Sequence, residues 1–205
     1  MDTLYIADCS PLQDEANLAA VLPYLDATRQ QRIARLQLPE KRAQCAAAGL
    51  LLTRLFGQDD TPPTLFHGSR GKPYLYGRDD AFFSLSHSAN WVVCATADNE
   101  IGVDAQVITP FNPKVAARCF TERERTWLAE NPTERFTPLW TAKEAYIKFT
   151  GFGLVLPLGS FETPMPADGP DDANHCFWRQ FKHENLFITL CCAKEWQGKL
   201  QIITL

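Results

Sequence analysis

The sequence predicts an α+β protein built from two halves. The chain has 205 residues, of which 45% are hydrophobic and 21% charged, and this composition is typical of a globular fold. Its predicted elements follow the order strand, helices, strands and then helices, strands. Because the turn Asp98-Asn99-Glu100 separates the two series, we expect two α+β halves, residues 1–99 and 100–205. No sequence repeat relates them.

The first half begins with a predicted strand, Leu4 to Ala7. A helix is predicted from Pro39 to Phe56, because proline suits the first turn, the body is rich in Ala and Leu, and Gly57 provides a stop. Residues 61–77 contain three prolines and three glycines, which favour a loop or a short edge strand. Two further strands are predicted, at residues 81–85 and 91–97.

The second half opens with a predicted strand, Ile101 to Val107. One helix is expected after Thr121, and a longer one begins at Asn131-Pro132 and runs to Thr150, where Gly151 ends it. A closing set of antiparallel strands is predicted at Phe161 and at residues 176–181, 186–193 and 200–205. The proline-rich stretch 164–172 reads as a surface loop.

The distribution of charge limits the classes of partner. The net charge of -4 provides no global basic field for nucleic acid. Six basic residues and one acid lie between residues 27 and 57, which is consistent either with an anion site or with a solvated helix face.

The cysteines, the amino terminus and the short apolar runs favour a cytoplasmic protein. The seven cysteines form no CxxC pair and several lie in apolar runs, so we expect buried free thiols in a reducing compartment. The amino terminus lacks the pattern of a signal peptide, and the longest apolar runs are too short to span a membrane. We therefore expect no membrane partner.

The helix that ends at Thr150 carries the first candidate site residues. Trp140, Glu144 and Lys148 recur every four residues and so share one stripe of the helix. An ordinary Glu–Lys pair at this spacing, worth about 0.2–0.5 kcal/mol, is the simpler interpretation.

The strand Ile101 to Val107 adds candidate metal ligands. Asp104 and Gln106 point to one face, between apolar neighbours that point to the other. A buried carboxylate is costly unless it is paired or bound to metal, and one or two carboxylates with water and phosphate oxygens suit Mg²⁺. An aspartate in a turn is the alternative. Ser86 and His87 could bind phosphate oxygens, whereas no GxSxG elbow supports a serine hydrolase.

Four motifs in order resemble one family. They are Gly71-Lys72-Pro73, Ser86-His87-Ser88, Gly102-Val103-Asp104 and Trp140-Thr-Ala-Lys-Glu-Ala-Tyr-Ile-Lys148 followed by Gly151. Together the motifs are similar to those of the Sfp-type 4'-phosphopantetheinyl transferases. The resemblance implies two similar α/β lobes related by a pseudo-twofold axis. It also implies Mg²⁺-dependent transfer of phosphopantetheine from coenzyme A to a serine of an apo acyl or peptidyl carrier protein, by a monomer.

The resemblance also implies roles for individual residues. Asp104, Gln106 and Glu144 would hold the metal, and Glu144 and Lys148 would be catalytic. Contacts to the phosphates and nucleotide of coenzyme A would come from Arg29, Arg32, Lys72, Ser86, His87, Lys143 and Lys148. Glu124 matches a family acid, although Thr121 and Glu124 also form a capping box.

Two positions differ from the family pattern. Gln106 stands where many relatives have a second acid, so the site has one negative charge fewer. Gln44 and Cys45 stand near a position where many relatives have an arginine, which Arg42 would replace. A non-catalytic coenzyme A-binding module, or a carrier-protein-binding module, of the same fold is the alternative function. The segment between Asn112 and Trp127 is a candidate docking surface for the carrier, or a solvated helix face.

Overall fold

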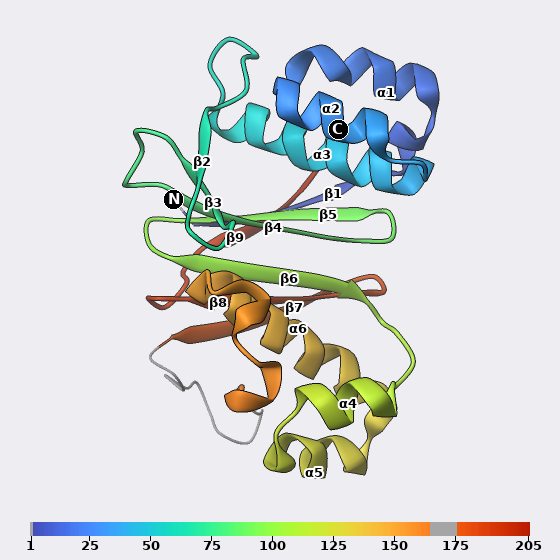
Figure 1. Ribbon diagram of the computed structural model, residues 1–205, viewed down its shortest axis with the longest axis vertical. Helices are drawn as coiled ribbons and strands as arrows, with labels where there is room; N and C mark the ends of the chain where they lie inside the picture. Colours follow the sequence, from blue (N-terminus) through green and yellow to red (C-terminus); the bar gives the residue numbers. More distant parts are fainter. Residues whose placement is uncertain (1, 165–175) are drawn as a thin grey trace.

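The computed structural model describes residues 2–164 and 176–205 and has two sheets between two layers of helices (Figure 1). The first sheet has the strand order β4 (Phe82–Ser88), β5 (Trp91–Ala97), β1 (Thr3–Asp8), β9 (Lys199–Ile203). It is covered by helices α1 (Glu15–Val21), α2 (Ala27–Arg35) and α3 (Pro39–Phe56). The mixed α+β class expected from the sequence is confirmed.

The second sheet has the strand order β6 (Ile101–Val107), β8 (Leu186–Cys192), β7 (Phe177–His183). Its outer face is covered by the long helix α6 (Pro132–Thr150), and α4 (Pro113–Cys119) and α5 (Glu122–Glu130) lie beyond it. A two-stranded ribbon, β2 (Leu65–His67) and β3 (Pro73–Leu75), occupies the region expected to be loop or short strand. Short 3-10 helices complete the fold at residues 10–13, 22–24, 153–155 and 158–160.

The elements with local start and stop signals have the predicted bounds. Helix α3 begins at Pro39 and ends before Gly57, and α6 ends before Gly151, which adopts a left-handed φ of 67°. Strands β5 and β6 also agree with their predicted ranges, whereas β4 continues past Leu85 to Ser88. The part of the predicted surface loop at 165–172 lies outside the described residues.

The closing strands differ from the prediction in two ways. Strand β9 does not join the antiparallel second sheet but runs parallel to β1 in the first, with Ile6 beside Ile202. The reason is non-local, because β1 has a free edge and β9 satisfies its hydrogen bonds. Phe161 lies in no strand, and its ring contacts that of Tyr146 at 4.5 Å. The division at residue 99 and the pseudo-twofold axis stay predictions.

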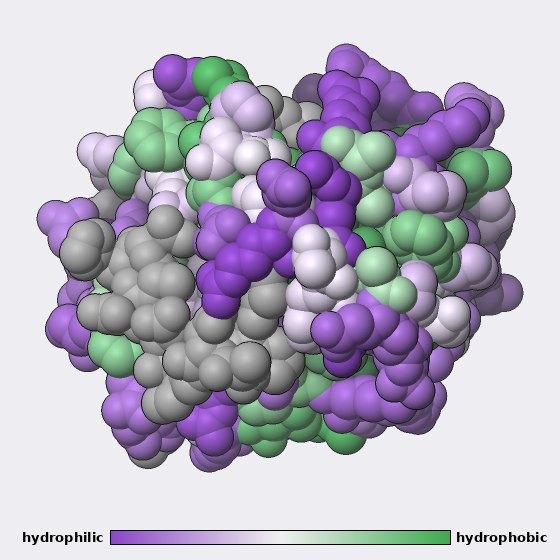
Figure 2. Space-filling model, turned by 90° about the horizontal axis from the view of Figure 1, so that it is seen from below, coloured by the Kyte–Doolittle hydropathy of each residue, from purple (hydrophilic) through white to green (hydrophobic). Residues whose placement is uncertain are grey.

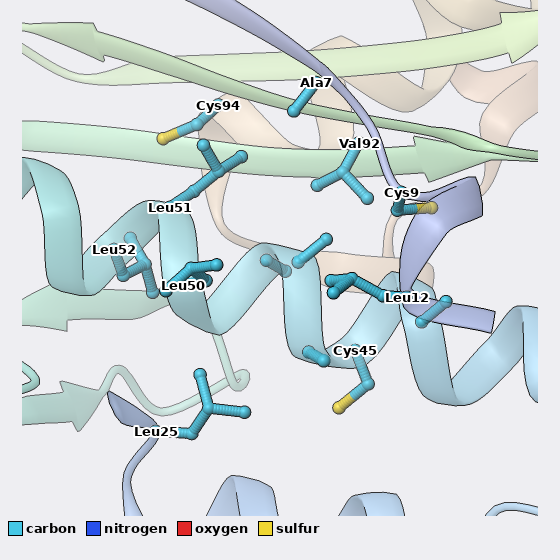
Figure 3. Close-up of a cluster of buried hydrophobic side chains, with 14 of the residues drawn as sticks. Ala7, Cys9, Leu12, Leu25, Cys45, Leu50, Leu51, Leu52, Val92 and Cys94 are labelled. Carbon is cyan, nitrogen blue, oxygen red and sulfur yellow. The ribbon is translucent and has the colours of Figure 1, made fainter. Parts of the chain in front are cut away.

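The apolar core has two main parts. Leu50, Leu51 and Leu52 of α3 pack on Val92 and Cys94 of the first sheet (Figure 3). A second cluster fills the space between the sheets, with Leu4, Ile6, Val103, Ile188 and Leu190 among its buried members. Fully burying such a side chain stabilises a fold by about 1.5–3 kcal/mol. All seven cysteines are buried free thiols, as the sequence predicted.

The two sheets meet along their outer strands β4 and β6. Serines at alternate positions of β4 point toward β6, because successive side chains of a strand point to opposite faces. Ser84 Oγ accepts a hydrogen bond from the Val103 amide at 3.0 Å, and Ser88 Oγ accepts one from the Val107 amide at 3.0 Å. Hydroxyl groups therefore connect the two sheets where no strand ladder does.

Among the described residues, no helix combines the length and apolar character needed to cross a membrane. The end of the molecule that carries α4 and α5 mixes hydrophilic and hydrophobic residues on its surface (Figure 2).

Candidate active site

A glycine lets helix α6 approach the strand that carries the candidate metal ligand. A Cβ added at Gly102 would lie 2.1 Å from the Ala145 carbonyl oxygen and 2.3 Å from the Phe149 nitrogen, so no side chain fits there. Because alternate residues share a face, Asp104 and Gln106 lie on the same face as Gly102. This close packing brings α6 directly over Asp104.

Asp104 is the centre of a small polar cluster. Its Oδ1 atom accepts hydrogen bonds from Ser86 Oγ at 2.8 Å and from Lys148 Nζ at 2.7 Å. Lys148 Nζ also donates to Ser86 Oγ at 2.9 Å and to the Leu85 carbonyl at 3.3 Å. The Asp104 side chain is 10% exposed and that of Lys148 30% exposed, so the pair stays accessible to solvent. Strands β4 and β6 and helix α6 thus each contribute one side chain.

Glu144 lies one helical turn before Lys148. Within residues 2–164 and 176–205, its carboxylate has no hydrogen-bond or ion-pair partner. Partial burial raises the pKa of Glu144, the negative charge of Asp104 raises it further, and Lys148 acts in the opposite direction. The shift means that the two carboxylates interact electrostatically, and Glu144 is available to a cation or a proton.

Helix α6 presents these residues to two cavities. Glu144 and Trp140 line a cavity of about 580 Å³, together with Lys114, Val115, Arg118, Cys119, Leu156, Pro157 and Leu158. Lys148 lines a smaller cavity of about 260 Å³, together with residues 70–73, 83–85, Ile147, Gly151 and Gly153. A ligand that reaches both cavities would pass Glu144 and Lys148 in succession.

His87 belongs to a basic group on the other face of β4. Its side chain is exposed and points away from that of Ser86, since neighbours on a strand alternate. The pKa of His87 is lowered, first because surrounding groups displace water and then because Lys41 and Lys148 add positive charge, with a smaller effect from Arg32. Such a group attracts anions.

Two of the predicted phosphate ligands point into the protein. Lys72 Nζ donates to Glu100 at 2.6 Å and to the carbonyls of Ile101 and Phe149 at 3.0 Å each, and burial lowers its pKa. Arg29 donates to the Cys45 carbonyl at 3.1 Å, next to Asp26. Their assignment to coenzyme A stays a prediction.

Lys143 and Glu124 form a separate, enclosed pair. Lys143 Nζ lies 2.7 Å from Glu124 Oε2, and both side chains are 0% exposed. Thr121 and Glu124 make the capping box that the sequence predicted at the start of α5. The structure brings neither residue into the cluster around Asp104.

The residues around Asp104 fit a magnesium ion in part. No group of three or more His, Cys, Asp or Glu side chains that could hold a metal occurs in the described part of the chain. Mg²⁺ commonly uses one or two carboxylates and completes its shell with water and substrate oxygens. Asp104 and Glu144 supply two such carboxylates, and Gln106 lies on the same strand face as Asp104.

Sequence reasoning missed several residues near the site. Lys41 was noted only as part of a basic segment, and the structure places it near His87. The alternating serines at 84, 86 and 88 were a visible signal for a face of β4 that contacts β6. Residues 156–158 carry no such signal, because apolar residues in a loop do not indicate which cavity they line.

Comparison with known proteins identifies the family. The model of the 4'-phosphopantetheinyl transferase superfamily matches residues 100–197, which include Asp104, Glu144 and Lys148. The chain is similar to the 4'-phosphopantetheinyl transferase Sfp of Bacillus subtilis (34% identical, covering 60% of this chain and 59% of the relative). It is also similar to the 4'-phosphopantetheinyl transferase HetI of Nostoc (33% identical, covering 69% and 66%).

One longer match covers both halves of the chain. The L-aminoadipate-semialdehyde dehydrogenase-phosphopantetheinyl transferase of Saccharomyces cerevisiae is 28% identical, and the match covers 92% of this chain and 79% of the relative. The matches to the Bacillus subtilis relatives span about 59% of those proteins. The motifs, the cluster around Asp104 and these matches agree, and the chain belongs to the Sfp-type 4'-phosphopantetheinyl transferases.

Proposed function

We propose that the protein transfers the 4'-phosphopantetheine group of coenzyme A to a serine hydroxyl of an apo carrier protein. The observation that carries the proposal is the cluster of Asp104, Ser86 and Lys148 with Glu144 one turn away, between two cavities. This cluster combines acids for a divalent cation with an ammonium for phosphate oxygens. Family membership supports the reaction, because the similar proteins are named as 4'-phosphopantetheinyl transferases.

Asp104 and Glu144 would hold Mg²⁺. Gln106 would contribute its amide oxygen directly or through water, as its position on the face of Asp104 allows. When bound, the ion neutralises negative charge on the pyrophosphate of coenzyme A. The charge of Asp104 raises the pKa of Glu144, and a shared cation would offset this repulsion.

The chemical step forms one bond and breaks another. The serine oxygen of the carrier attacks the β-phosphorus of coenzyme A, and adenosine 3',5'-bisphosphate leaves with the electron pair of the broken P–O bond. The Glu144 carboxylate would accept the serine proton, directly or through a water molecule, since no described residue pairs with it and its pKa is raised. Lys148 Nζ would hydrogen-bond to the leaving phosphate oxygen and stabilise its charge.

The two cavities suggest how the substrates are arranged. The 260 Å³ cavity next to Lys72 and Lys148 would take phosphate and nucleotide groups, with the basic group around His87 nearby. The 580 Å³ cavity at Glu144 would take the pantetheine arm and the serine of the carrier. Its apolar residues Trp140 and Leu156 suit the arm, and Lys114 and Arg118 suit an acidic partner.

The carrier would dock on the segment from Asn112 to Trp127. Lys114 and Arg118 of this segment line the cavity, and Arg123 is 53% exposed, next to Glu162. A monomer in the cytoplasm, with no nucleic-acid or membrane partner, stays part of the proposal.

Mass spectrometry of several apo carriers after incubation with coenzyme A and Mg²⁺ tests the proposal. We expect one or more carriers to gain the mass of phosphopantetheine, and the gain to require both the metal and the acceptor serine. A chain that binds coenzyme A and leaves all carriers unmodified would instead be a binding module. Gln106 is the observation that favours this second candidate, because it removes one charge from the metal site.

A further inference from the structure

The enclosed pair of Lys143 and Glu124 connects three parts of the second half of the chain. Lys143 belongs to α6 and directly precedes Glu144, whereas Glu124 belongs to the first turn of α5. Glu124 Oε2 lies 2.7 Å from Lys143 Nζ and accepts the Thr121 amide at 2.8 Å. One oxygen of the carboxylate is thus committed to α5 and α6.

The other oxygen binds a segment that lies after α6. Glu124 Oε1 accepts hydrogen bonds from the amide of Thr163 at 2.8 Å and from its hydroxyl at 3.0 Å. Lys143 Nζ donates to the Phe161 carbonyl and lies 4.3 Å from the centre of the Phe161 ring. The pair therefore holds residues 161–163 through both of its charges.

The same segment forms part of the cavity at Glu144. Residues 156–158 line that cavity, and the backbone at Gly159 packs against α4, where an added Cβ would lie 3.5 Å from the Arg118 carbonyl. We call residues 156–163 the cavity wall. It runs from the cavity, where α4 contributes Lys114 and Arg118, to the anchor at its own end, residues 161–163.

We propose that Lys143 and Glu124 are a positioning pair, which fixes the cavity wall opposite Glu144 and thereby sets the fit of the carrier's serine and pantetheine arm. The inference rests on the proposed function and deepens it. It replaces the phosphate contact that the family resemblance implied for Lys143, because an ammonium with no exposed area cannot reach a phosphate.

The physical basis is the cost of an unpaired buried charge. Neither side chain can leave the other without burying a lone charge, so the geometry of the pair is fixed. Its hydrogen bonds pass that constraint to the backbone of Phe161 and Thr163. Sub-ångström placement near a reacting group affects rate strongly, which gives the pair an influence on transfer without contact to substrate.

The test uses the full chain with Lys143→Met and Glu124→Gln combined, so that no lone charge is buried. Hydrogen–deuterium exchange of residues 156–163 is measured first, followed by calorimetry of coenzyme A binding with Mg²⁺ and by the KM for an apo carrier. We expect faster exchange of the cavity wall and a KM for the carrier about 10- to 100-fold higher, with coenzyme A affinity unchanged within about twofold.

Thr163→Val provides a milder variant if the double variant fails to fold. It removes one hydrogen bond from the Glu124 carboxylate and should raise exchange of the wall and the carrier KM by a smaller factor. Thr96→Val is the matched control, since it removes one hydroxyl hydrogen bond, to the Thr3 carbonyl at 3.3 Å, in the first sheet and outside the proposed docking segment.

The outcomes are distinguishable. Weaker coenzyme A binding with an unchanged wall would make Lys143 a phosphate ligand and overturn the inference, as would unchanged exchange in both variants. Faster exchange with an unchanged carrier KM would overturn the positioning role. If the wild-type chain modifies no carrier while the variant's wall still exchanges faster, the anchoring stands and the proposed function fails.

Discussion

Helix α6 carries two lysine–carboxylate pairs five residues apart, and they differ in their access to solvent. The side chains of Lys143 and Glu124 are both 0% exposed, whereas those of Lys148 and Asp104 are 30% and 10% exposed. The N–O distance is 2.7 Å in both pairs. Distance alone therefore does not distinguish a structural pair from a candidate catalytic one.

The difference lies in what surrounds each pair. Around Lys143, backbone and side-chain groups of Thr121, Phe161 and Thr163 complete the hydrogen bonds. Next to Lys148 lies the carboxylate of Glu144, with which no residue in the described ranges pairs, and both residues line cavities. A closed pair can fix geometry, while an open pair beside a second acid can exchange its partner for a ligand.

The largest expected effect is at the open pair. Asp104→Asn keeps the shape of the side chain but removes the charge that Lys148 and a metal require. We expect the transfer rate, followed by mass spectrometry of an apo carrier, to fall about 10³-fold. Asp98→Asn, at an exposed position, is the matched control and should transfer normally. If the Asp104→Asn enzyme stayed active, the open pair would not be the catalytic one.

Loss of the enclosed pair should affect stability more than loss of the open pair, which is the reverse of the order expected for activity. Lys143→Met leaves the buried Glu124 charge without its partner, which should lower the free energy of unfolding by about 3–5 kcal/mol. Lys148→Met breaks a pair whose lysine is more accessible and whose carboxylate keeps the Ser86 hydroxyl, so it should cost less, about 1.5–3 kcal/mol. Urea unfolding of both variants measures the difference, and equal losses would mean that burial does not separate the pairs.

Glu144 should destabilise the fold while it serves the reaction. Because its pKa is raised, the folded state binds its proton more tightly than the unfolded state does, and the ionised form weakens the fold above the raised pKa. We expect Glu144→Gln to raise the Tm at neutral pH by about 2–4 °C and to abolish transfer. The gain in Tm should disappear as the pH falls below the usual range of glutamate.

Thermal unfolding of Glu144→Gln and wild type across pH checks this sign. Glu195→Gln, at an exposed position of the second half, serves as the control. A lower Tm for Glu144→Gln at neutral pH would show that the carboxylate is stabilised by its surroundings, contrary to the direction of its pKa shift.

The smallest effect is expected at Gln106, which stands where many members of the family have a second acid. Gln106→Glu restores a second carboxylate on the face of Asp104, and we expect Mg²⁺ or Mn²⁺ affinity without coenzyme A to increase about 3- to 10-fold. Titration calorimetry or Mn²⁺ electron paramagnetic resonance measures it, with Gln197→Glu at an exposed site as control. Equal affinities of the Gln106→Glu chain and wild type would place position 106 outside the metal site.

The elements with local signals could be predicted from the sequence. Pro39 and Gly57 delimit α3, and Asn131 and Gly151 delimit α6, because caps and stops act on the neighbouring turn. The parallel pairing of β9 with β1 was missed, since it depends on residues almost 200 positions apart that no local pattern records.

The candidate site divides in the same way. Residue types and spacing placed Asp104 on one face of a strand and Glu144 and Lys148 on one stripe of a helix. The helix lies over the strand because Gly102 permits close packing. Ser86 reaches Asp104 because its face of β4 packs against β6.

The sequence by itself determined which residues could bind metal or phosphate, and which helix and strand would carry them. The tertiary structure decided which lysine is enclosed and which is open, and which carboxylate has no partner among residues 2–164 and 176–205. Burial and desolvation arise from contacts between segments far apart in the chain, as at Lys143, Glu124 and Thr163. Adjacent residues of one motif, Lys143 and Glu144, therefore have opposite surroundings.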